Sequence, residues 1–306
     1  MPVFFWSVGL AIRIDRYMSD TLVRAISGNK EIRAFGVSMR DSVEEMRSCH
    51  DTSPVVTAAL GRLLSAGAMM GSMLQGDDKL TLSVRSDGPV EGLTVTADAS
   101  GHVKGFAIEP QVINPIREWD KKLDVGGIVG NGTLRVIKDQ GLKEPYIGEV
   151  GLISGEIAED LTLYFAQSEQ IPSAVGLGVL MNKDNTVREA GGFIVQLLPG
   201  ASEESISTLE RNVGKISSVT DLMKEGKSSA DILGMLLDPL GCEILSETPV
   251  SYRCDCSRER IEEVLLSLGE KELRSLIAEG KETEVKCHFC NKAYKFSVEE
   301  LEALLP

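Results

Sequence analysis

Alternating apolar and polar positions mark the start of the chain as a pair of strands. The runs 22–26 and 32–37 are rich in aliphatic and aromatic residues, and they flank the turn sequence Ser27-Gly28-Asn29-Lys30. Two such runs joined by a short glycine-containing turn predict a β-hairpin.

A long apolar segment follows, and its length favours a helix. Ser53 is a good N-cap, Pro54 suits the first helical position, and Gly76 predicts an end after about Gln75. Glycines within the segment lower its helix propensity, so we expect tertiary packing to hold it and neighbouring backbone to approach closely. Arg62 and many small residues argue against a membrane span.

From Lys79 to Ile108 the pattern changes to strands separated by turn sequences, which predicts an antiparallel meander. Ser154 is expected to cap a later helix that runs through Gln167. Further strands are expected at 133–138, 146–150, 175–181 and 192–198, the last two buried. Residues 18–199 are therefore predicted to form an α+β core domain, rich in antiparallel sheet and packed with helices.

The pattern changes again after residue 199, to helical periodicity in short pieces. Helices are predicted at 202–213, 219–225 and 229–237, separated by glycine and ended by Pro239. Helices this short are marginal alone and depend on a surface to pack against. We interpret residues 200–248 as a metastable helical linker docked on its neighbours.

The last segment, 249–306, is predicted to be a small separate domain. Ser257 begins one helix, a second follows, and a hairpin flanks the turn that starts at Cys287. Ser297 and Glu300 form a capping box for a final helix. A module of roughly sixty residues has too small a core to be robust, so we expect a structural metal.

Composition then limits the function classes. The chain has 306 residues, a net charge of −14 and an isoelectric point near 4.8, which argues against nucleic acid as a main partner. Gly176-Leu177-Gly178 and Gly126-Gly127 lack the full phosphate-binding fingerprint, so no nucleotide is expected. The apolar segment 2–12 lacks the flanks of a secretory signal, so residues 1–17 are interpreted as an extra N-terminal extension. No membrane partner is expected.

Four of the six cysteines carry the most specific chemistry. Cys254 and Cys256 form one tight pair, and Cys287 and Cys290 form another. Two such pairs predict four thiolate ligands around one Zn²⁺ per chain, and paired reduced cysteines place the protein in the cytosol. Such a zinc site could be purely structural or could act as a redox switch, and the spacing leaves both open. A closed four-cysteine site is usually structural, whereas disulfides within each pair would replace one long-range tie by two local ones and turn oxidation into unfolding.

Other candidate ligands are weaker. His288 is not expected to bind the metal beside four thiolates, and His50 and His102 have no identifiable partner at metal or catalytic spacing. Cys49 and Cys242 have no paired spacing and are interpreted as buried apolar residues or ordinary free thiols. Arg253, Arg258, Lys286 and Lys292 are placed in the sequence where they could offset the charge of the thiolates.

The chain resembles the redox-regulated molecular chaperones of the thirty-three kilodalton heat-shock protein family. The resemblance rests on Cys254-Asp255-Cys256-Ser257 and Cys287-His288-Phe289-Cys290-Asn291, and it extends through the core. The core motifs are Gly76-Asp77-Asp78-Lys79-Leu80, Asn131-Gly132-Thr133-Leu134, Ser168-Glu169-Gln170-Ile171-Pro172-Ser173 and Ala190-Gly191-Gly192-Phe193.

This resemblance implies a holdase that needs no ATP, is not an enzyme, and is quiescent when reduced and zinc-bound. Oxidation of the Cys287/Cys290 pair and then the Cys254/Cys256 pair would release zinc, unfold the module and linker, and expose a surface for unfolding client proteins. The oxidised form is expected to be a homodimer. Two other hypotheses stay open: a constitutive zinc-ribbon adaptor with a structural zinc site, and a thiol oxidoreductase. The second lacks a thioredoxin-like strand-helix context before its cysteine pair.

Overall fold

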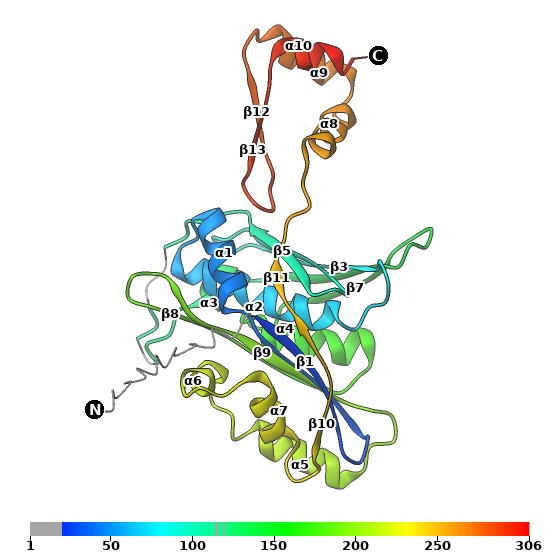
Figure 1. Cartoon of the computed structure of the whole chain (residues 1–306). Coiled ribbons are helices and arrows are strands. Elements are labelled where there is room, and N and C mark those ends of the chain that lie inside the picture. Colours follow the sequence, from blue (N-terminus) through cyan, green and yellow to red (C-terminus); the bar gives the residue numbers. More distant parts are fainter. Residues whose placement is uncertain (1–19, 114–115, 119, 306) are drawn as a thin grey trace, which may run out of the picture.

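The computed structural model describes residues 20–113, 116–118 and 120–305 of the chain. The predicted extension, residues 1–17, lies outside this part. Within it, the predicted α+β class is confirmed: two mostly antiparallel sheets and their helices form a core, and a small cysteine-bearing module stands apart from it (Figure 1).

The first sheet has five antiparallel strands in the order β10-β1-β2-β9-β8. The predicted N-terminal hairpin is confirmed as strands β1 and β2. Its members are β1 (Thr21–Ser27), β2 (Ile32–Ser38), β8 (Ser173–Met181), β9 (Val187–Leu197) and β10 (Cys242–Pro249). The end of the predicted helical linker is thus a strand, because residues 242–249 pair with the otherwise open edge of β1.

The second sheet has six strands in the order β11-β5-β4-β3-β6-β7. The β3–β4 and β4–β5 pairings confirm the predicted meander, and in the described part of the chain β11 is the one strand of this sheet that is parallel to its neighbour. Its members are β3 (Lys79–Ser86), β4 (Gly92–Asp98), β5 (His102–Ala107), β6 (Gly132–Asp139), β7 (Tyr146–Gly151) and β11 (Ser251–Tyr252).

The predicted long helix is α2 (Pro54–Gly71), and it packs against strands of both sheets. By length and composition α2 resembles a membrane span, but 89% of that window is buried inside the protein. A Cβ at Gly71 would lie 2.9 Å from the backbone oxygen of Asp98, so here a neighbouring strand does approach the helix backbone. At Gly61 and Gly67 the close neighbours are valine side chains instead.

Two helix starts differ from the sequence prediction. Helix α1 (Arg40–His50) was not predicted, and Asp20 accepts the backbone N–H groups of Asp41 and Ser42 in its first turn. Ser154 does not cap the later helix, α4 (Ala158–Tyr164). The carboxylate of Asp160 instead accepts backbone N–H groups on both sides of the turn that precedes the helix, so the helix begins later. A π-helical turn (Phe165–Glu169) continues it, and α3 (Val125–Val129) lies earlier in the chain.

The three predicted linker helices are present as α5 (Glu203–Val213), α6 (Val219–Lys224) and α7 (Ser229–Leu237). Serine side chains at 202, 218 and 228 cap them. They cover one face of the five-stranded sheet (Figure 1), and the two surfaces share a continuous apolar cluster. Helix α7 supplies its most deeply buried linker residues: Ile232, Leu233, Leu236 and Leu237.

The C-terminal module contains its own small core. Its elements confirm the predicted two helices, hairpin and final capped helix. They are α8 (Arg258–Ser267), α9 (Glu270–Ala278), β12 (Thr283–Lys286), β13 (Ala293–Phe296) and α10 (Val298–Ala303). The tip of the β12–β13 hairpin points back toward the core (Figure 1).

Candidate metal centre

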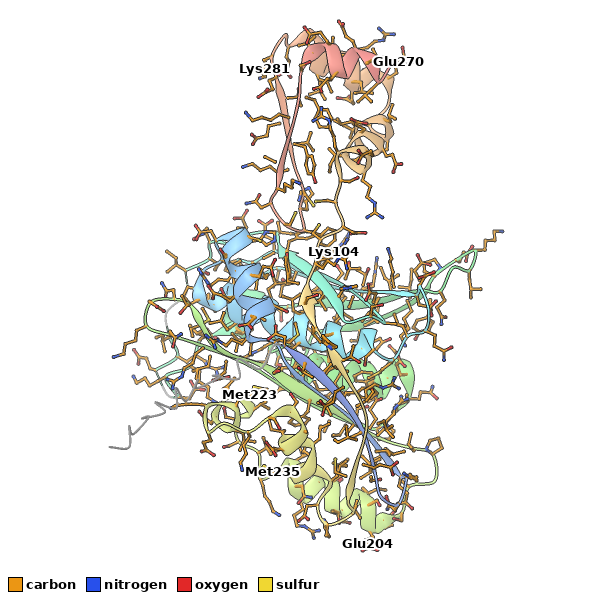
Figure 2. The ribbon with its side chains drawn as sticks, viewed as in Figure 1. Lys104, Glu204, Met223, Met235, Glu270 and Lys281 are labelled. Atoms are coloured by element: carbon orange, nitrogen blue, oxygen red, sulfur yellow. The ribbon has the colours of Figure 1, made fainter. Side chains whose placement is uncertain are left out.

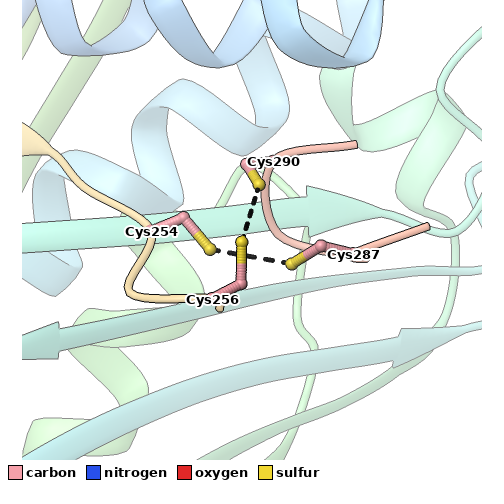
Figure 3. Close-up of side chains that lie close together, drawn as sticks. All are labelled: Cys254, Cys256, Cys287 and Cys290. Carbon is pink, nitrogen blue, oxygen red and sulfur yellow. Dashed lines mark hydrogen bonds between the residues drawn. The ribbon is translucent and has the colours of Figure 1, made fainter. Parts of the chain in front are cut away.

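Two short segments bring the four predicted cysteines together. Cys254 and Cys256 lie between β11 and α8, and Cys287 and Cys290 lie in the turn between β12 and β13. In that turn the N–H of Asn291 donates to the oxygen of Cys287 at 2.8 Å, with Asn291 in the left-handed region (φ 59°). The tight turn directs both of its sulfurs to one side, where the other pair meets them (Figure 3).

The sulfur geometry fits a tetrahedral metal. Cys254 Sγ lies 3.6 Å from Cys287 Sγ, Cys256 Sγ lies 3.4 Å from Cys290 Sγ, and all four sulfurs lie within 4.8 Å of one another. Zn–S bonds of about 2.3 Å give a regular tetrahedron with sulfur-sulfur edges of about 3.8 Å. All four thiols are free and partly or fully buried. The donor set and its spacing therefore suit Zn²⁺.

Burial and hydrogen bonding give the thiols different acidities. Burial raises the pKa of Cys254 to about 11 and also raises the pKa of Cys290. Burial opposes ionisation of Cys256 as well, but hydrogen bonds from Tyr294 and from the neighbouring thiols outweigh it and lower its pKa. A metal that binds here must displace protons from Cys254 and Cys290, which resist losing them, so binding depends on pH.

Tyr294 is a candidate site residue that the sequence reasoning missed. Its hydroxyl donates to Cys256 Sγ at 3.1 Å, while the neighbouring inward residue, Phe296, packs in the core of the module. The sequence did hold a signal for this residue. Tyr294 and Phe296 are two positions apart on β13, so their side chains lie on the same face of the strand, toward the turn and the core of the module.

The four cations that the sequence placed near the centre each have another partner in the structure. Arg258 pairs with Glu300 at 2.6 Å, Lys286 with Glu284 at 3.7 Å, and Arg253 contacts His102 at 3.2 Å, while Lys292 lies 5.1 Å from the Tyr294 ring. The close cation partners at the centre belong to Asp255, between the first two cysteines. Its carboxylate accepts from Lys104 and Arg260, and these bonds hold its pKa well below its usual range.

The metal centre is seated on the core through the Cys287–Cys290 turn. The Phe289 ring meets Phe106 of β5 edge-on at 5.3 Å, and Lys104 lies 4.8 Å from the same ring. Figure 2 shows Lys104 at this junction. The Phe289 backbone oxygen accepts from the hydroxyl of Tyr252 and lies 3.1 Å from His50 Nε2.

The remaining histidines and cysteines lie outside the cluster. The His288 ring packs beside Phe106, with 5.6 Å between the ring centres. Burial lowers the pKa of His50. Its partner in the turn, the Phe289 oxygen, could not be identified from the sequence. Cys49 and Cys242 are partly buried free thiols packed against apolar clusters, and burial raises the pKa of each. This agrees with their predicted role as ordinary thiols.

Replacing Tyr294 with Phe should weaken zinc binding by about tenfold, because partners that orient or polarise metal ligands typically contribute 10–100-fold to affinity. Competition with a chromogenic zinc chelator measures the change. Tyr146→Phe, which removes a hydroxyl on β7 of the core and outside the cysteine cluster, is the matched control. Equal zinc affinity in the two variants would show that the Tyr294 hydroxyl does not support Cys256.

Comparison with known proteins identifies close relatives over nearly the whole chain. A family model described as Hsp33 protein matches residues 20–297. A 33 kDa chaperonin of Lachnoclostridium phytofermentans is 54% identical over 289 residues, which cover 94% of this chain and 99% of that protein. One from Agathobacter rectalis is 54% identical over 288 residues, with 94% and 100% covered. The solved 33 kDa chaperonin of Thermotoga maritima superposes with a TM-score of 0.87 at 37% identity, covering 94% of this chain and 97% of that one.

Proposed function

Because this chain belongs to the Hsp33 family, we propose that it is a cytosolic, ATP-independent chaperone whose holding activity is switched on by oxidation. The family membership supports the chaperone function, with unfolding proteins as partners. The observation that carries the switch is the position of the four-thiol centre, at the contact between the small module and the core. We propose no enzymatic activity.

In the reduced state, Cys254, Cys256, Cys287 and Cys290 are proposed to hold one zinc ion. When bound, Zn²⁺ would supply four bonds that tie two segments thirty residues apart in sequence, worth on the order of 10–16 kcal/mol in small zinc peptides. The module's own buried core is small, so its fold depends on this tie. Its hairpin turn then keeps Phe289 against Phe106 and Tyr252.

Oxidation removes the thiolates that hold the metal. Hydrogen peroxide takes two electrons from each pair of thiolates, and with two protons from solvent this yields one disulfide and two molecules of water. We propose the pairings Cys287–Cys290 and Cys254–Cys256, because the partners of each pair stay close after the module loses its fold. A bond across the pairs would preserve the long-range tie. Mapping the disulfides by mass spectrometry distinguishes these outcomes, and cross-pair bonds would contradict an unfolding switch.

Loss of the module's fold has a direct route to the linker. Cys254 lies two positions after the end of β11, and the hydroxyl of Tyr252 in β11 lies within hydrogen-bond reach of both the Phe289 oxygen and the Gly105 oxygen. Strand β10 precedes β11 and contacts α7. Releasing the Phe289 turn therefore removes a partner from the strand that leads back to the linker, whose short helices are marginal without packing.

The surface that the linker covers is the proposed client surface. Val23, Ile32, Phe193 and Val195 of the five-stranded sheet are buried under the linker helices. Linker release would expose this apolar face, and such a face suits unfolding proteins or a second copy of the chain. We propose that the oxidised form is a homodimer and that it needs no nucleotide.

The decisive measurement is zinc content and aggregation suppression in parallel. Peroxide with mild heat should release about one zinc per chain and, in the same samples, stop a denatured client from scattering light. The reduced protein is the control and should suppress little aggregation. If oxidation leaves the zinc in place, or releases it without gain of activity, the switch is excluded. A structural-zinc adaptor with unchanged helicity would then be favoured.

A further inference from the structure

Strand β8 leaves one edge of the five-stranded sheet open. Among the described residues, β8 pairs with β9 on one side and with no strand on the other. The sequence of its nine residues, SAVGLGVLM, carries no charge. It was predicted to be a buried strand, yet most of its residues are only partly buried, because this edge has no neighbouring strand. A long apolar edge without charge is a site for strand addition.

The hydrogen-bonding direction of β8 can be assigned residue by residue. The Leu197 N–H donates to the Pro172 oxygen at 3.0 Å, and the Gly176 oxygen points at β9, where a Cβ on Gly192 would lie 2.3 Å from it. Even-numbered residues of β8 therefore face β9, since both backbone groups of one residue point the same way in an antiparallel pair.

The N–H and C=O groups of Val175, Leu177 and Val179 consequently point away from the sheet. Their side chains pack partly on the main core, and no hydrogen bond of these outward groups occurs within the described part of the chain. The edge thus presents three donor–acceptor pairs in a row, spaced by two residues. Unpaired backbone groups beside apolar surface are costly to leave unsatisfied once water is excluded.

A groove of about 1030 Å³ runs along this edge. Its apolar walls come from β8, from the start of α2 with Val55 and Ala58, and from the linker with Val213, Ile216 and Val219. The segment that includes Val112 and Leu123 also lines it, and charged side chains such as Arg62 and Lys122 contribute to its walls. The linker wall reaches β8 itself, because a Cβ on Gly178 would lie 2.7 Å from the Thr220 side chain. Oxidative release of the linker would therefore lengthen and widen the groove.

We propose that this groove binds an extended apolar segment of an unfolding client, which adds to β8 as a sixth strand. The inference rests on the proposed holdase function and assigns it a site and a mode of binding. Only an extended chain satisfies outward backbone groups and fills apolar walls together. A second copy of β8 fits less well, since it would bring its own linker and α2 walls to the same edge, and each chain carries a net charge of −14.

Amide exchange of the full-length oxidised protein with a fluorescent seven-residue valine- and threonine-rich peptide tests the site directly. The outward amides of Val175, Leu177 and Val179 should gain protection, whereas Gly176 and Gly178, already bonded to β9, should not. A peptide with the same side chains and fully N-methylated amides should bind at least tenfold more weakly, since it lacks strand hydrogen bonds. Equal affinity for both peptides, or protection elsewhere, overturns the proposal.

Leu177→Pro with Leu177→Ala as its matched control isolates one backbone group. Both changes shorten the side chain, but only proline removes the outward N–H, at an edge position where the β9 ladder is kept. Peptide affinity should fall roughly tenfold from the Ala to the Pro variant, with zinc content and thermal midpoint of the reduced proteins checked for folding. Equal affinities in two folded variants contradict strand addition.

Four further outcomes separate this proposal from the others. Full aggregation suppression by oxidised Leu177→Pro with unchanged peptide affinity overturns the groove but leaves the holdase function. Failure of the oxidised wild type to suppress aggregation or bind peptide overturns both. If peptide binds only after residues 1–17 are removed, the groove belongs to that segment instead. If protection of the β8 edge rises with protein concentration alone, the groove binds a second copy of the chain instead.

Discussion

Replacing Cys287 with Ser should reduce zinc from about one per chain to almost none and unfold the C-terminal module while the core stays folded. The reason is the balance of energies within the module. Its fully enclosed core has few side chains, among them Leu273, Phe296 and Leu301, whereas a four-thiolate zinc site in a small peptide supplies on the order of 10–16 kcal/mol. Removing one of four ligands forfeits a large part of that stabilisation.

Hydrogen exchange distinguishes the two regions. Amides of the β12–β13 hairpin should exchange rapidly in Cys287→Ser, while those of β3 and β4, which pair along their full length inside the second sheet, should remain protected. Cys242→Ser is the matched control, because that thiol lies outside the cluster, and it should keep both zinc and protection. A hairpin that stays protected in zinc-free Cys287→Ser would mean that the module folds without its metal. Zinc release could then not unfold the module, which would contradict the proposed switch.

The parts of the fold that the sequence predicted are those decided by neighbours along the chain. The hairpin at 21–38, the meander from Lys79, the capped helices after Ser202 and Ser257, and the two cysteine pairs all depend on turn residues, caps and spacing within a few positions. The zinc-like geometry followed because each cysteine pair carries its own turn.

The parts that escaped prediction depend on residues far apart in sequence. Ser154 has the composition of an N-cap, but Asp160 occupies the turn amides and moves the start of the helix. Residues 242–249 form a strand because β1 offers an edge more than 200 positions away. The contacts of Phe289 with Phe106, Tyr252 and His50 also escaped prediction. These residues lie on separate elements, and no spacing in the sequence indicates that they meet.

This division also explains why cysteine spacing alone left the switch undecided. The spacing of the cysteines identifies the metal ligands, but it does not show which other parts of the protein the ligand turn contacts. The structure adds the second half: the ligand turn rests on the core beside the strand that leads to the linker, and the linker covers an apolar sheet. A structural zinc site needs no such connection, whereas a switch requires it.

Replacing Leu233 with Ala should make the reduced, zinc-bound protein active without oxidant. Leu233 is fully buried in α7, and its Cγ lies so close to β2 that a Cβ on Gly36 would be 3.1 Å away. A buried Leu→Ala change costs about 2–5 kcal/mol, which is large for a nine-residue helix that depends on packing for its stability. The linker should therefore detach and uncover the sheet while the metal centre, which Leu233 does not touch, stays intact.

Met235→Ala provides the comparison within the same helix, because Met235 is 43% exposed (labelled in Figure 2) and its loss leaves the buried face unchanged. Suppression of client aggregation under reducing conditions, measured beside zinc content, should rise to near the oxidised wild-type level in Leu233→Ala and remain low in Met235→Ala. Rapid exchange of α7 amides in Leu233→Ala without gain of activity would contradict the proposal that the linker masks the client surface. Activity accompanied by loss of zinc would instead place the effect at the metal centre. Activity with zinc retained separates linker release from metal loss, and it would show that linker release alone is enough to uncover the client surface.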